Sequence, residues 1–186
     1  DDDWVELYNP NDIEVSLGGW SIQKHSSDDP CSIDETFYKK SFDDNHIIKA
    51  KSFFLIVSNK ASDLLKNMAD MTIGWSLTDN NTIYLVRSSD KVLDGDDKNI
   101  VDKVGFGEKS CFSEGNSAPN PSDSKSIERK KLGLDTDNNF NDFKVSDEAS
   151  PGDTFPKVTI YDVTDYSLNL SASSPGAPIY NILIKW

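Results

Sequence analysis

The sequence contains few of the residues on which most hydrolases and zinc proteins depend. Only two of its 186 residues are histidines. His25 and His46 stand in neither an H-E-x-x-H nor an H-x-H pattern, and we expect both to be exposed loop residues. No C-x-x-C pair occurs, which excludes a zinc ribbon or a thioredoxin-type redox motif. Because no nucleophile, base and orienting group form a known pattern, we expect no catalytic residues and no enzyme activity.

Long apolar runs and an excess of positive charge are also missing. The longest apolar run, residues 53–57, has the length of a strand and is too short to cross a membrane, so we expect no membrane insertion. Acidic residues outnumber basic ones 32 to 19, which gives a net charge of -13. Phosphate binding depends on Lys and Arg, so we expect no nucleic acid as a partner.

Two cysteines stand in polar, loop-like stretches. Cys31 lies in "DDPCSIDE" and Cys111 in "GEKSCFSEG". Two free surface thiols are one interpretation, and a disulfide in an oxidising compartment is the other. We favour the disulfide because exposed unpaired cysteines are usually avoided.

Short strand-like runs recur along the chain, separated by Gly, Pro, Asn and Asp. Alternation and β-branched or aromatic residues predict strands at 4–8, 15–17, 20–23, 53–58, 82–87, 100–106, 126–130 and 143–145. One short helix is predicted within 58–71, with Leu64, Leu65, Met68 and Met71 on one face and Ser58, Asn59 or Ser62 as N-cap. This spacing predicts an all-β sandwich or barrel, with the helix covering one end.

The composition changes near residue 152. Pro151, Gly152 and Pro156 indicate a linker, so we predict a first domain at 1–152, a linker at 153–157 and a second β segment at 158–186. About thirty residues with three strands cannot bury a core alone. The second segment therefore either docks on the first domain or begins a second, partial one.

A cluster of acidic and amide residues is the one candidate metal site. "DTDNNFND" places Asp135, Asp137 and Asn139 at alternate positions, as in the first part of a calcium loop. The sixth position is Phe140 where glycine is expected, and the twelfth is Ser146 where Glu is expected. A structural Asx turn is the favoured interpretation, calcium is the alternative, and no other cofactor is expected.

Several stretches, taken in order, resemble the lamin tail domain family, in particular its bacterial members. They include "WVELYNPNDIEVSLGGWSI", "IIKAKSFFLIVSN", "GWSLTDNNTIYLVRSSD" and "IVDKVGFG", and the resemblance extends from residue 1 to about 152. It implies an immunoglobulin-like β-sandwich without catalysis of its own. From the residues themselves we expect Trp4, Trp20 and Trp75 to pack in the core, and Arg129 to pair with Glu6 across the sheet.

The sequence departs from that family at its start, because the strand that usually precedes the Trp4 strand is absent. A sandwich without this strand exposes unpaired backbone groups that another strand can complete. "YNILIKW", from Tyr180, alternates and is a candidate donor within the chain or between copies. Residues 157–186 also loosely resemble the first strands of a fibronectin type III domain.

Three functions remain open at this point. The favoured one is a non-catalytic module of a secreted or cell-surface, bacterial-type protein that serves adhesion, binding or assembly, with a protein or surface polymer as partner. The second is an accessory domain of an extracellular, nuclease-like hydrolase. The third is a structural subunit of a filament or surface layer that self-assembles through an open sheet edge, completed by strand donation.

Overall fold

The computed structural model describes residues 2–26, 31, 37–92, 95–121, 124–147 and 149–152, together with the backbone of 182–185. Its strands are β1 (Trp4–Tyr8), β2 (Val15–Ser16), β3 (Ser21–Ser26), β4 (Phe37–Ser41), β5 (Ile47–Ile48), β6 (Phe53–Ser58), β7 (Met71–Ile73), β8 (Asn81–Val86), β9 (Ile100–Phe106), β10 (Ser126–Arg129), β11 (Phe143–Ser146) and β12 (Ile182–Lys185). Its helices are α1 (Asp63–Met68) and α2 (Asn139–Asp142).

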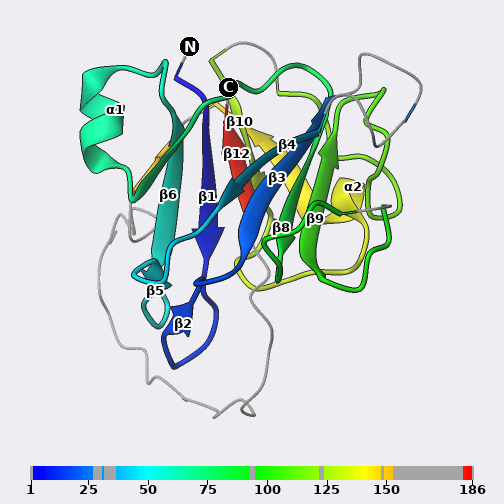
Figure 1. Ribbon diagram of the computed structural model, residues 1–186. Coiled ribbons are helices and arrows are strands. Elements are labelled where there is room, and N and C mark those ends of the chain that lie inside the picture. The colour runs from blue at the N-terminus through cyan, green and yellow to red at the C-terminus, as the bar shows by residue number, and fades with distance from the viewer. Residues whose placement is uncertain are drawn as a thin grey trace, which may run out of the picture.

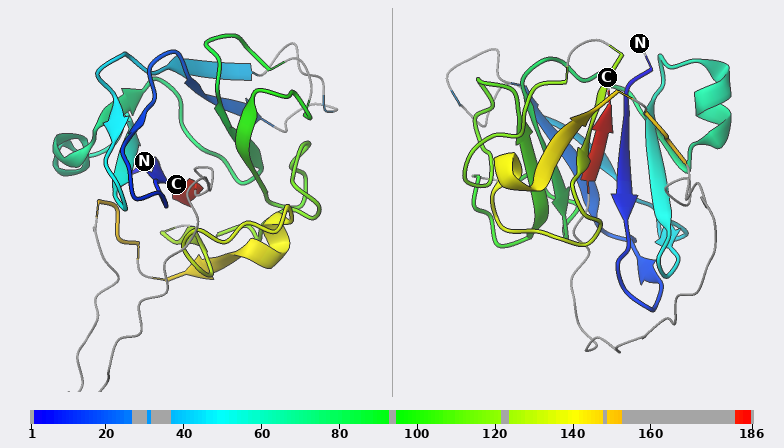
Figure 2. Two further views of the ribbon diagram at one scale, coloured as in Figure 1. Left: turned by 90° about the horizontal axis from the view of Figure 1, so that it is seen from below. Right: turned by 180° about the vertical axis from the view of Figure 1, so that it is seen from behind.

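Two sheets form the layers of a sandwich (Figures 1 and 2). One has six strands in the order β11-β10-β12-β1-β6-β7, and the other has four in the order β4-β3-β8-β9. A small two-stranded sheet, β2-β5, extends from one end. The strands pair antiparallel except β6 and β7, which pair parallel. The predicted all-β, immunoglobulin-like sandwich is confirmed.

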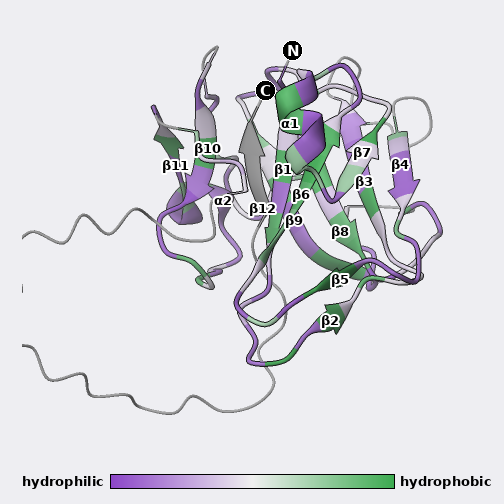
Figure 3. Cartoon of the chain, turned by 90° about the vertical axis from the view of Figure 1, so that its left-hand side faces the viewer, coloured by the Kyte–Doolittle hydropathy of each residue, from purple (hydrophilic) through white to green (hydrophobic). Residues whose placement is uncertain are grey.

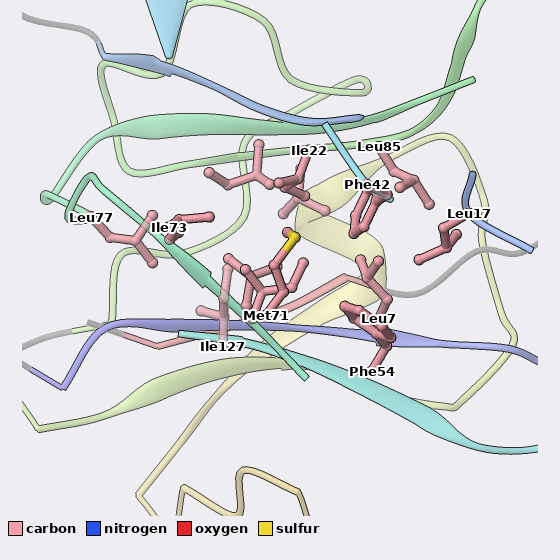
Figure 4. Close-up of a cluster of buried hydrophobic side chains, with 14 of the residues drawn as sticks. Leu7, Leu17, Ile22, Phe42, Phe54, Met71, Ile73, Leu77, Leu85 and Ile127 are labelled. Atoms are coloured by element: carbon pink, nitrogen blue, oxygen red, sulfur yellow. The ribbon is translucent and has the colours of Figure 1, made fainter. Parts of the chain in front are cut away.

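The main core lies between the two layers, as Figure 4 shows. Alternation places Val5 and Leu7 of β1 on the inner face, where they pack with Ile83 and Leu85 of β8. The apolar character of β6 and the polar character of β4 are visible in Figure 3. Strand periodicity thus decides which side chains leave water, and their burial is the main favourable term in folding.

Helix α1 covers the outer face of the six-stranded sheet beside β6 (Figure 1). Ser62 is its N-cap, and the Ser62 hydroxyl accepts a hydrogen bond from the Leu65 amide at 3.4 Å. The predicted apolar face is wrong for Leu64 and Met68, which are 75% and 48% exposed. The helix ends after six residues, so only Leu65 reaches the sheet, and Met71 already belongs to β7.

Strand β12 lies between β1 and β10 in the six-stranded sheet (Figure 1). It pairs antiparallel with β1, Leu7 opposite Ile182 and Val5 opposite Ile184, and with β10, Ile127 opposite Ile184. Residues 153–181 lie outside the described residues, so the predicted linker and second domain stay predictions. The backbone of 182–185 itself forms part of the first sandwich.

Candidate functional site

A buried arginine joins the two sheets. Arg129 lies at the end of β10 in the six-stranded sheet, and its Nη2 donates to both carboxylate oxygens of Asp102, at 2.9 and 3.0 Å. Asp102 belongs to β9 in the other sheet, and both side chains are 0% exposed. A buried pair of opposite charges therefore spans the sandwich. Removing Arg129 would leave the Asp102 carboxyl group buried in the core without its charge partner.

The other side of the guanidinium is occupied as well. Arg129 Nη1 donates to the Leu134 carbonyl at 3.1 Å and to Asp142 Oδ2 at 3.4 Å. Its distance to Asp135 Oδ1 is 3.5 Å. The Phe143 ring lies against the same group, 4.7 Å from ring centroid to guanidinium carbon. We call Arg129, Asp102, Asp135 and Asp142 the arginine cluster.

The pKa shifts follow from this arrangement. Burial alone would lower the pKa of Arg129, but the carboxylates of Asp102 and Asp135 outweigh it and raise that pKa. Burial alone would raise the pKa of Asp142. Hydrogen bonds from the Thr136 hydroxyl and amide, with the charge of Arg129, lower it instead. The arginine and Asp142 are thus held in their charged forms.

Asn139, the first residue of α2, binds the edge of β9. Its Oδ1 accepts from the amides of Gly105 at 2.9 Å and Glu114 at 3.0 Å. Its Nδ2 donates to the Lys103 carbonyl at 3.0 Å and to Glu114 Oε2 at 3.1 Å. A single amide side chain thereby satisfies polar groups at the edge of β9. The Ala118 backbone pairs with the same edge, since its amide donates to the Gly105 carbonyl at 2.8 Å and its carbonyl accepts from the Gly107 amide at 3.1 Å.

Glu114 lies close to the arginine cluster and has an unusual pKa. Burial is the largest cause, and the negative charges of Asp102 and Asp135 add to it, so the pKa of Glu114 is raised to about 8. At neutral pH this carboxyl group is mostly protonated, which limits the negative charge that Arg129 must balance.

Three carboxyl groups come close enough to suggest a cation site. Asp102, Glu114 and Asp135 offer oxygens that all lie within 4.8 Å of one another, the one group of its kind in the described part of the chain. Such oxygens suit hard divalent cations. Asp102 and Asp135 already contact the guanidinium of Arg129, so the cation that these carboxylates bind here is a side chain of the protein.

In the predicted calcium loop of Asp135, Asp137 and Asn139, both acceptor positions of Asn139 Oδ1 are used by backbone amides. Asp135 Oδ1 accepts from the Asp137 amide at 3.1 Å, which is the Asx turn of the favoured interpretation. Asp137 has a φ of 54° and lines an open hollow with Asp96 and Asp97. Calcium binding by Asp135 and Asp137 stays a prediction.

The predicted pair between Arg129 and Glu6 is wrong. Glu6 lies on β1 and Arg129 on β10, and β12 separates the two strands. Glu6 Oε1 instead accepts from the Gly152 amide at 2.8 Å. A residue on a neighbouring strand could have paired with Arg129, but a residue two strands away is beyond cross-strand reach.

The sequence missed Asp102, Asp142 and Glu114 as members or neighbours of the cluster. For Asp102 a signal existed, because a single carboxylate stands inside the apolar run "IVDKVGF" and a buried carboxylate needs a partner. Asp142 and Glu114 lie in polar segments whose patterns carry no such signal.

The prediction that His25 is an exposed loop residue is wrong. His25 lies in β3, is 1% exposed, and its ring centroid is 5.1 Å from that of Phe112.

The disulfide between Cys31 and Cys111 is confirmed, with Cα atoms 5.2 Å apart. It links the connection between β3 and β4 to the segment after β9, and so closes a long stretch of chain around the four-stranded sheet.

Two of the three tryptophans that were expected to pack in the core are buried. Trp4 and Trp75 are 3% and 7% exposed. Trp20 is half-buried, with the guanidinium of Arg87 5.0 Å from its ring centroid.

The fold and the buried ion pairs define a disulfide-linked, immunoglobulin-like β-sandwich. A model of the lamin tail domain family matches residues 1–108, more than half of the chain, and the chain belongs to this family. The match ends after β9, so Arg129 and strands β10 and β11 lie beyond it. No curated protein matches the sequence. In the described part of the chain no helix is long and apolar enough to cross a membrane.

Proposed function

We propose that this chain acts without catalysis, as a module of a secreted or cell-surface protein that serves adhesion, binding or assembly. The observation that carries this proposal is the arginine cluster. In this cluster the guanidinium is enclosed by Asp102, Asp142, the Leu134 carbonyl and the Phe143 ring. Since Arg129 and Asp102 are 0% exposed, a substrate has no access to them.

The proposed location is supported by the cysteines. Disulfides form and persist in oxidising compartments and are rare where thiols are kept reduced. Cys31 and Cys111 are paired. The proposed partner is a protein or a surface polymer, because a net charge of -13 opposes contact with phosphate backbones.

Turnover assays test the absence of catalysis. The purified full chain is incubated with ester, peptide, glycoside and phosphodiester substrates, each with calcium, with magnesium and with a chelator. We expect no product above the rate without protein. Hydrolysis that survives two independent purification schemes and falls in Asp102→Asn or Glu114→Gln would overturn the proposal.

Thiol trapping tests the location. Cells that produce the protein naturally are treated with a membrane-impermeant thiol reagent, and the peptides around Cys31 and Cys111 are analysed without reduction. We expect the linked peptide pair in material at the cell surface or in the medium. Recovery of both cysteines as free thiols, from inside the cells only, would contradict an extracellular role.

A further inference from the structure

The position of β12 is the feature with the clearest consequence for assembly. β1 pairs with β6 on one side and with β12 on the other, and β10 pairs with β11 and β12. Among the described strands β1 and β10 do not pair with each other. The acceptor slot, which we define as the facing edges of Trp4–Tyr8 and Ser126–Arg129, therefore needs an inserted strand to satisfy both edges.

The strand that fills the acceptor slot is separated from the rest of the sandwich by residues 153–181. A chain of that length can span about 100 Å at most when extended. This reach exceeds the diameter of a small domain, so covalent geometry allows residues 182–185 to enter a slot on another copy. The backbone pairing is the same in both cases, because the acceptor strands are identical.

We propose that β12 exchanges between copies, so that residues 182–185 of one chain complete the six-stranded sheet of a second chain. The partner is thus a second copy of this chain, recognised by strand addition at the acceptor slot. Reciprocal exchange gives a closed dimer, and one-way donation from copy to copy gives an open chain of subunits. The inference rests on the proposed function as an assembly module and names its partner.

Concentration decides between the two arrangements. β12 makes the same contacts whether it lies in its own chain or in a second copy. The ratio of the two arrangements therefore depends on the effective concentration of β12 at the acceptor slot of its own chain. Effective concentrations of tethered binding segments are on the order of millimolar. Dilute protein therefore keeps its own strand, and protein crowded above that level, as in an array on a surface, exchanges it.

Cysteine pairs placed in the register of β12 and β1 test the exchange. Val5 and Ile184 are Cα partners, as are Glu6 and Leu183. Neighbouring antiparallel pairs alternate between wider and closer spacing, so one of the two sets suits a disulfide. Full-length V5C, carrying a tag, is mixed with untagged I184C, and E6C is mixed with L183C in parallel. After incubation and mild oxidation, covalent dimers are counted on non-reducing gels.

We expect mixed covalent dimers whose yield rises with protein concentration. At the highest concentration the matched pair should exceed the mismatched control, V5C with I182C, by at least tenfold, because a shift of two residues moves the sulfurs out of reach. The double variants V5C/I184C and E6C/L183C should form the same link within one chain at low concentration, which shows that the sheet has folded with β12 in place.

Two outcomes would overturn the proposal. In one, the double variants link within the chain while no matched mixture exceeds the mismatched control at any concentration, so β12 stays in its own slot. In the other, neither double variant links, so β12 does not occupy the slot. Neither outcome affects the proposed function, because the turnover assays and the thiol trapping do not depend on β12. Conversely, observed turnover would overturn the proposed function without changing the cross-linking result.

Discussion

The two sheets of the sandwich are assembled in different ways. In the four-stranded sheet β3 pairs with its neighbour in sequence, β4, and β8 pairs with β9. All of Ser21–Ser26 pairs with Asn81–Val86, and the Cys31–Cys111 link closes the chain around this sheet. The six-stranded sheet instead joins β1 to β12, which come from opposite ends of the chain.

Both sheets contain a long-range pairing, β3 with β8 in one and β1 with β12 in the other, and the second spans the greater length of chain. Bringing distant segments together costs more chain entropy than closing a hairpin, so such pairings need additional support. In the six-stranded sheet that support comes from β12 and from Arg129, which ties β10 to β9 in the opposite sheet. The predictions below weaken each sheet in turn, from the largest expected effect to the smallest.

Replacing Arg129 should have the largest effect. In Arg129→Met the carboxylate of Asp102 is left buried without its partner, so we expect the free energy of unfolding to fall by about 3–5 kcal/mol. Urea unfolding followed by tryptophan fluorescence measures the change. The double variant R129M/D102L also removes the Asp102 carboxylate and should recover part of the loss, because Asp135 and Asp142 still lack the guanidinium.

The matched control for this prediction is Lys144→Met, which breaks the pair between Lys144 and Glu128 at 2.9 Å on the surface of the same sheet. Exposed pairs contribute about 0–1 kcal/mol. If R129M costs no more than K144M, the arginine cluster does not hold the two sheets together.

Removing the disulfide should have the next largest effect. The double variant C31S/C111S releases a link between residues 80 apart in sequence. We expect a loss of roughly 2–4 kcal/mol, because the unfolded chain regains the freedom of a long loop. Guanidinium unfolding of the wild type with and without reductant provides the comparison. An unchanged midpoint under reduction would show that the four-stranded sheet does not depend on the link.

Asn139→Ala should destabilise the edge at β9. The substitution removes the hydrogen-bond partner of the Gly105 amide, the Glu114 amide and the Lys103 carbonyl. We expect the free energy of unfolding to fall by about 2–3 kcal/mol. Thermal unfolding measures it. Asn141→Ala in the same helix changes an exposed side chain and should stay within about 0.5 kcal/mol of the wild type.

Glu114→Gln should change the pH dependence of stability. In the folded protein the pKa of Glu114 is raised from its ordinary value of 4.5 to about 8. The protonated carboxyl group therefore stabilises the fold fully below pH 4.5, and this stabilisation is lost as the pH rises through 8. The melting temperature of E114Q relative to that of the wild type should therefore rise by roughly several degrees as the pH goes from 5 to 8.5. A melting-temperature difference that is constant over this range would contradict the shift, and E14Q, at an exposed residue, is the control.

The strands that alternate or are apolar throughout could be predicted from the sequence. The runs 4–8, 53–58 and 100–106 match β1, β6 and β9 in their bounds. β4 was missed, because it exposes Tyr38 and its two lysines and only Phe37 is buried. β7 was read as part of a helix, since Met71 continues the helical spacing although the chain is extended from Ala69.

The candidate site was harder to predict than the fold. Arg129 was recognised as a structural residue, but its partner depends on which strands are neighbours and which sheets face each other. Those relations come from pairing between distant segments, which no local pattern encodes. The disulfide was favoured because exposed unpaired cysteines are usually avoided, and with two cysteines in the chain only one pairing is available.

Hydrogen exchange of the full-length chain tests the central claim most directly, namely that residues 182–185 complete the six-stranded sheet. Peptides that cover β12 should exchange as slowly as those that cover β1 and β6, because all three strands then lie inside the sheet. If the amides of 182–185 exchange within seconds while β6 stays protected, the C-terminal strand does not complete this sheet.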